Sequence, residues 1–146
     1  MRISTRFSDS IHILAFMNIY SNIRLSSDTI AGSVETSPVV IRRLMSALRK
    51  AGLITTKRGN PEPKLAKPPT QITLLEIYFA VEGERSLFEL DKKTNPACIV
   101  GGNIQSVLGG YYEQAKLAAQ EKLRSYTLQD VIDDILKKEN SKNKLV

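Results

Sequence analysis

The spacing of apolar residues predicts three helices in the first third of the chain. A buried first helix is expected over Ser8 to Tyr20, with Ser8 as its N-cap, because apolar residues fill a wide stripe there. A short helix over Asp28 to Val34 follows, and its acidic first residue suits the positive end of the helix dipole. The third helix, Pro38 to Ala51, has the clearest pattern, with one apolar face formed by Ile41, Leu44, Met45 and Leu48.

The third helix begins with a strong local signal, and a hairpin is expected after it. Ser37 can cap the first free amides, and proline at the first helical position loses no useful hydrogen bond. The segment Leu53 to Thr56 is short and β-prone, Arg58 to Pro63 is turn-like, and Lys64 to Ala66 can return as a second strand. Helix, short helix, turn, helix and hairpin is the order of a winged helix-turn-helix.

A long amphipathic helix is the main feature of the second half. One apolar stripe continues from Asn103 to Ser125, roughly 35 Å of helix at 1.5 Å per residue, and such a helix needs a partner surface. Gly109 and Gly110 interrupt it and favour a kink or a close crossing. A last helix is expected over Leu128 to Leu136, before a frayed polar tail from Lys137.

These elements predict a mainly α fold with a small β-hairpin wing and a long dimerisation helix. Residues 1–70 are expected to form the winged helix-turn-helix domain. Residues 71–101 are expected to hold a connecting helix, capped by Thr73 and Glu76 and ending near Val81, and then a sensor loop from Gly83 to Gly101. Residues 102–146 are expected to hold the dimerisation helix and the C-terminal helix.

The excess of positive over negative charge lies entirely in the N-terminal part of the chain. The net charge of the whole chain is +6, but residues 1–67 hold eleven lysines and arginines against four acidic residues, and the remainder holds ten against eleven. Neutralising phosphates releases condensed counterions, so a basic half joined to a neutral half suits a polyanion-binding protein. A solvated basic face without a partner is the alternative interpretation.

The basic side of the third helix gives the candidate DNA-binding residues. Side chains near the N-terminal half of a helix in the major groove reach base edges. We therefore expect base contacts from Ser37, Val39, Val40, Arg42 and Arg43. Nearer the other end, Arg49 and Lys50 are expected to bind phosphate or stay in solvent. The wing supplies Lys57, Arg58 and Lys64 for the DNA backbone or an adjacent minor groove, and ordinary surface charge is the alternative interpretation.

The single cysteine, Cys98, excludes an intramolecular disulfide, a thiolate-built zinc site and a cysteine-ligated iron–sulfur cluster, and favours the reducing cytoplasm. A nearby helix N-terminus and the cations Lys92 and Lys93 would favour its thiolate, as in a sensor, whereas an inert cysteine packed between alanine and isoleucine is the simpler interpretation. His12, on an apolar helix, is expected to be packed or hydrogen-bonded rather than a ligand.

Catalytic and membrane signals are absent from the sequence. It shows no nucleophile with a base and an orienting group, no phosphate-binding glycine loop and no paired metal ligands, so we expect no enzyme, metal site or cofactor. No run of about eighteen apolar residues and no signal-peptide pattern is present, so we expect no membrane contact.

Three runs of residues resemble the Rrf2 family of bacterial transcription regulators. They are SPVVIRRLMSALRKAGLI from Ser37 to Ile54, the pair Arg58 and Gly59, and LAKPPTQITLLEIY from Leu65 to Tyr78. The resemblance implies a homodimer that clasps through residues 102–125 and presents two winged helices to a pseudo-palindromic operator. It also implies that Arg42 faces bases and that Arg58 approaches the minor groove.

Two departures from the family pattern refine this resemblance. The resemblance implies that members with an iron–sulfur cluster hold it through three cysteines in the loop before the dimer helix. This chain has only Cys98 there, so no cluster is expected. Its loop, NPACIVG, is similar to that of the YwnA-like branch, in which the cluster is absent. Many members carry paired glycines in the wing where this chain has Pro61, Glu62 and Pro63, so deep insertion of the wing tip is not expected.

Two functional hypotheses follow. The first is a dimeric, sequence-specific DNA-binding transcriptional regulator, acting as a repressor and responding to a small-molecule or oxidant effector. The second is a thiol-sensing protein-interaction module whose basic half does not recognise a DNA sequence. Enrichment of a binding site from random DNA separates the two.

Overall fold

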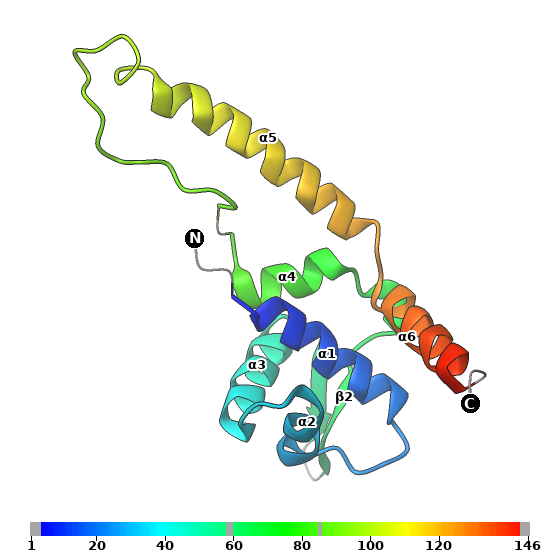
Figure 1. Cartoon of the computed structure of the whole chain (residues 1–146). Helices are drawn as coiled ribbons and strands as arrows, with labels where there is room; N and C mark the ends of the chain where they lie inside the picture. Colours follow the sequence, from blue (N-terminus) through cyan, green and yellow to red (C-terminus); the bar gives the residue numbers. More distant parts are fainter. Residues whose placement is uncertain (1–3, 58–59, 85, 144–146) are drawn as a thin grey trace.

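The computed structural model describes residues 4–57, 60–84 and 86–143, and has the element order of a winged helix-turn-helix followed by a long helix (Figure 1). The elements are α1 (Arg6–Ile19), α2 (Ser27–Val34), α3 (Pro38–Lys50), β1 (Ile54–Lys57), β2 (Asn60–Leu65), the 3₁₀ turn η1 (Pro69–Gln71), α4 (Leu74–Glu82), α5 (Ile104–Arg124) and α6 (Leu128–Asn143). The predicted fold class, mainly helical with a two-stranded hairpin, is confirmed.

Side-chain caps fix the starts of several helices, among them α2 and α4. The Ser26 hydroxyl accepts a hydrogen bond from the Thr29 N–H at 3.1 Å and opens α2. At α4, Thr73 and Glu76 form a reciprocal capping box, in which the Glu76 N–H donates to the Thr73 Oγ1 at 3.1 Å. Each cap satisfies amides that have no partner within the helix, so these boundaries follow from local chemistry.

The first helix begins earlier than predicted, and the last helix ends later. α1 begins at Arg6 rather than Ser8, and Thr5, not Ser8, occupies the N-cap position. The added turn carries Phe7, whose ring packs edge-on against Tyr78 at a centroid distance of 5.4 Å, a long-range contact that stabilises it. The segment from Lys137, predicted to be frayed, continues α6 to Asn143. Lysine and glutamate are good helix formers, so propagation does not require a buried face there.

The hairpin is longer than predicted and irregular. β1 and β2 pair antiparallel with Ile54 opposite Leu65 and Lys57 opposite Asn60, and the register shifts between Thr55 and Lys57. The predicted turn over residues 58–63 therefore contains much of β2. Prolines fit a two-stranded ribbon because each strand has one free edge, where a missing N–H costs no ladder bond.

One hydrophobic core joins α1, α3, α4 and α6. The fully buried side chains include Ile13 and Leu14 of α1, Ile41 and Leu48 of α3, Ile77 of α4 and Leu128 of α6. The start of α6 is also held by backbone hydrogen bonds, because the Leu128 N–H donates to the Ile72 oxygen at 2.8 Å and the Leu74 N–H donates to the Tyr126 oxygen at 3.0 Å. The C-terminal helix is thus part of the same compact unit.

α5 is the exception to this packing. It contains no buried residue, and Figure 1 shows it standing away from the helices of the core, alongside the loop that precedes it. It runs without interruption through Gly109 and Gly110. Within the described residues, no helix combines the length and the apolar character needed to cross a membrane.

Candidate nucleic-acid interface

The solvent side of α3 forms a continuous basic stripe. The opposite face of α3 is buried in the core through Ile41, Leu44, Met45 and Leu48. The exposed residues are Val39, Arg42, Arg43, Arg49 and Lys50. Spacings of three, four and seven residues place them on one side of an α-helix, so the core contacts themselves turn the cations outward.

The cations of this stripe, hereafter the α3 stripe, have no acidic partners among the residues that the structure describes. The ion pairs found there involve Arg6, Lys67, Lys116 and Arg124 instead. Unpaired guanidinium groups can form bidentate hydrogen bonds with phosphate or guanine without first breaking a salt bridge. The α3 stripe is therefore poised to meet a polyanion.

The N-terminal end of α3 is fixed, and this limits two of the predicted base contacts. The Ser37 hydroxyl accepts a hydrogen bond from the Val40 N–H at 3.3 Å, with Pro38 at the first helical position. Val40 is half-buried and packs against the core. Val39, Arg42 and Arg43 are the predicted readers whose side chains project freely, with Val39 54% exposed.

Two turns around α3 set its place in the fold. Glu35 ends α2 in the left-handed conformation with a φ of 59°, and the Thr36 N–H donates to the Ala31 oxygen at 3.2 Å. Gly52 follows α3 with a φ of 78°, a conformation that glycine adopts without strain. Glycine directly after a helix is a common C-terminal signal, whereas glutamate in a left-handed turn has no sequence signal of its own.

The wing lies next to α3, because β1 follows it after three residues and contacts it. Lys64 is exposed on β2, opposite Thr55. Lys57 is the last residue of β1, and Arg58 lies outside the described residues. On β2, Pro63 is buried and Glu62 is half-buried.

Cys98 lies in the loop before α5 and is exposed, so the expectation of a packed thiol is wrong. Hydrogen bonds from the backbone N–H groups of Gly101 and Val100 lower the pKa of this thiol. The loop is tightly turned, since a Cβ at Gly101 would collide with the backbone of Asn95. The predicted thiolate-favouring environment is thus built from backbone amides rather than from Lys92 and Lys93.

His12 was predicted to be either packed or hydrogen-bonded. It is exposed and hydrogen-bonded. Its Nε2 lies 2.7 Å from the Ser33 hydroxyl of α2. No group of three or more histidine, cysteine, aspartate or glutamate residues that could hold a metal ion occurs in the described part of the chain. A cysteine-ligated iron cluster does not fit this donor set, because the chain offers a single thiol.

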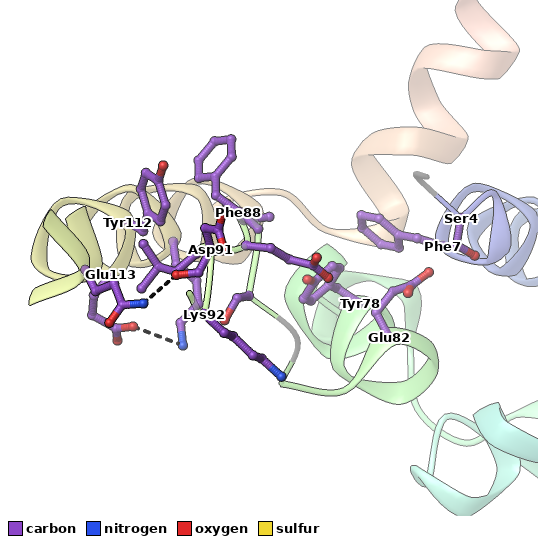
Figure 2. Close-up of a pocket in the computed structure, with 16 residues that line it drawn as sticks. Ser4, Phe7, Tyr78, Glu82, Phe88, Asp91, Lys92, Tyr112 and Glu113 are labelled. Carbon is purple, nitrogen blue, oxygen red and sulfur yellow. Dashed lines mark hydrogen bonds and ion pairs between the residues drawn. The ribbon is translucent and has the colours of Figure 1, made fainter. Parts of the chain in front are cut away.

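A cleft between α4 and α5 has no counterpart among the features predicted from the sequence. Its lining includes Phe7 of α1, Tyr78 and Glu82 of α4, and Tyr112 of α5, which Figure 2 shows around one cavity. These residues come from distant parts of the chain, and each on its own resembles an ordinary core or surface position. No motif links them.

Comparisons with known proteins agree with this geometry. The Rrf2 family model, described as an iron-dependent transcriptional regulator, matches residues 3–134. YwnA of Bacillus subtilis strain 168, named as an HTH-type transcriptional regulator, is 39% identical over 133 residues, which span 91% of this chain and 98% of YwnA. A crystal structure titled as a DNA binding protein has a TM-score of 0.71 and 39% identity, covering 87% of this chain and 98% of its own.

A second solved structure, CymR of B. subtilis, described as the global cysteine regulator, has a TM-score of 0.61 and 28% identity, covering 91% of this chain and 97% of its own. The family model, the sequence relative YwnA and the first solved structure each match most of this chain. The chain belongs to the Rrf2 family of transcriptional regulators.

Proposed function

We propose that this protein is a homodimeric, sequence-specific DNA-binding transcriptional regulator that represses by occupying its operator. The observation that carries the proposal is the α3 stripe, with exposed cations on one side and a buried apolar face on the other. Such a helix can enter the major groove while the core holds it from behind. The names of the relatives, an HTH-type regulator and a DNA binding protein, support the same function.

The roles of individual residues follow from their positions. Val39, Arg42 and Arg43 contact base edges, with Ser37 and Val40 at the same end of the helix. Arg49 and Lys50 contact phosphates, and Lys57, Arg58 and Lys64 of the wing contact the DNA backbone or the adjacent minor groove. Residues 1–70 form the DNA-binding domain, residues 71–101 connect it, and residues 102–146 complete the dimer and return to the core.

The dimer contact is assigned to α5 because its apolar stripe has no cover within one chain. Val107 is 48% exposed and Tyr111 is 67% exposed, and neither is buried by the loop or by α4. Hydrophobic residues exposed along a long helix mark a protein interface. A second copy related by two-fold symmetry would bury both stripes together and present two α3 helices to one face of the DNA.

Base reading by α3 is tested with Arg42→Ala, using Arg24→Ala as the control because Arg24 is exposed in the loop between α1 and α2. Loss of a bidentate base contact should cost about 1 to 3 kcal/mol on the operator and relax preference at one position. The control should bind as the parent does. Equal discrimination between operator and random DNA by Arg42→Ala and the parent would refute the assignment.

The dimer contact is tested with Tyr111→Glu in sedimentation velocity. A charge placed in a buried apolar interface should dissociate the dimer, because its desolvation is not compensated. Leu117→Glu is the control, since Leu117 is 50% exposed but lies about 120° around the helix from Tyr111. If Tyr111→Glu remains dimeric, or if both variants dissociate equally, the contact does not lie along the predicted stripe.

The exposed thiol of Cys98 supports the second candidate function, a thiol-sensing module. As the sensor of the regulator, Cys98 would make operator affinity fall or rise on oxidation, and Cys98→Ser would remove that response. An identical response in Cys98→Ser would exclude the residue from sensing. A protein that enriches no DNA sequence under reduced or oxidised conditions would instead favour the interaction module.

A further inference from the structure

A cleft of about 1040 Å³ separates the DNA-binding part of the chain from α5 (Figure 2). Its walls come from the start of α1, the end of α4, residues 86–92 of the loop and one side of α5. Cavities of several hundred to about a thousand cubic ångströms commonly hold small organic molecules. The volume of this cleft suits a molecule of that size.

Two aromatic pairs line the cleft on its two sides. Phe7 and Tyr78 meet edge to face with ring centroids 5.4 Å apart, and Phe88 and Tyr112 lie 5.3 Å apart. Figure 2 shows the first pair beside α1 and the second pair on the side of α5. Aromatic faces bind apolar bodies and also attract cations placed over the ring.

The lining is acidic although the chain is basic. Its carboxylates are Glu82, Glu89, Asp91 and Glu113, against the two ammonium groups of Lys92 and Lys116. Lys116 is already paired with Glu113 at 3.3 Å. Glu82 has Arg6 as a neighbour at 3.9 Å. The charges that then remain, Glu89 and Asp91 against Lys92, are still net negative and favour a positively charged ligand over an anion.

Glu82 supplies the second, independent observation. Its side chain is only 10% exposed, and its Oε1 is buried and accepts no hydrogen bond from the residues that the structure describes. Its Oε2 lies 3.9 Å from Arg6, whose guanidinium donates to the Val81 oxygen at 2.9 Å. A buried carboxylate oxygen without a donor is costly, so a ligand that donates a hydrogen bond to Oε1 would offset that cost.

We propose that the cleft binds a small organic cation, a protonated amine carrying an aromatic or apolar body. The ammonium donates to the Glu82 carboxylate, and the body lies between the two aromatic pairs. Binding here goes beyond the proposed DNA recognition and does not require it. Because α4 belongs to the core and α5 carries the proposed dimer contact, the ligand contacts both the DNA-binding part of the chain and the dimerisation helix.

Calorimetry of the full-length protein with three matched probes tests the proposal. Benzylamine, benzyl alcohol and benzoate share one ring and differ in charge. Benzylamine should bind saturably with one site per chain, and the other two at least about tenfold more weakly. Glu82→Gln should weaken benzylamine at least about tenfold, since a charge-assisted bond is lost, whereas Glu139→Gln on the exposed side of α6 should leave it unchanged.

Phe88→Ala gives a second test that does not depend on a buried residue. Phe88 is 43% exposed, so the variant should fold as the parent does and bind benzylamine at least about threefold more weakly. The proposal is overturned if benzylamine does not bind, if benzoate binds equally well, or if Phe88→Ala binds as the parent does. The titrations contain no DNA, so their failure leaves the proposed DNA recognition standing.

Discussion

Replacing Arg49 and Lys50 together by alanine removes two exposed cations from the far end of α3. In a two-fold complex the change is made in both protomers, so four phosphate contacts are lost. Each contact contributes about 0.9 to the slope of log affinity against log salt. The slope should therefore fall by about 3.6, and doubling the salt should cost the variant roughly twelvefold less affinity than it costs the parent.

Fluorescence anisotropy of labelled operator and random DNA over a series of potassium chloride concentrations measures both slopes. The preference for operator over random DNA should be retained, because both residues lie away from the base-reading end. Lys137→Ala with Lys138→Ala is the control, since it removes the same charge from the exposed surface of α6 and should leave the slope unchanged. A slope that falls by less than about 1 would refute phosphate contact by α3, and a fall of about 1.8 would indicate a single bound protomer.

Three further predictions concern folding and the loop. Leu48→Ala, at a fully buried position, should lower the free energy of unfolding in urea by about 2 to 5 kcal/mol, whereas Val39→Ala on the exposed face should change it by less than about 0.5 kcal/mol; equal losses would contradict the assigned faces. Ser37→Ala should cost about 1 kcal/mol and Ser37→Asp much less, and equal losses would argue against a capping role. Because the pKa of Cys98 is lowered, its thiolate persists to lower pH, and the rate of iodoacetamide alkylation should reach half its maximum at a lower pH than that of a cysteine in an unstructured peptide measured in parallel; an equal or higher midpoint would contradict the backbone hydrogen bonds.

Much of the fold follows from short-range chemistry in the sequence. Ser37 with Pro38, and Thr73 with Glu76, are complete capping signals, and both mark helix starts in the structure. The apolar face of α3 was predicted because four of its residues share one side of a helix. These features depend only on neighbours along the chain.

Features that depend on distant contacts were missed. The first turn of α1 is stabilised by Phe7 against Tyr78, and the cleft exists only because Glu82 and Tyr112 are brought together from two helices. The hairpin register depends on pairing across the wing. The extension of α6 has a different cause, because it depends on the good helix propensities of its lysines and glutamate rather than on an apolar stripe or a distant contact.

Selection of bound sequences from random duplex DNA, followed by the stoichiometry of the selected complex, tests the central claim most directly. The proposal predicts one enriched site with two-fold related half-sites, whose centres are separated by about one helical turn or a multiple of it. It also predicts two chains per duplex. Failure to enrich any sequence, or a single half-site bound by one chain, would contradict a dimeric regulator that reads DNA through α3.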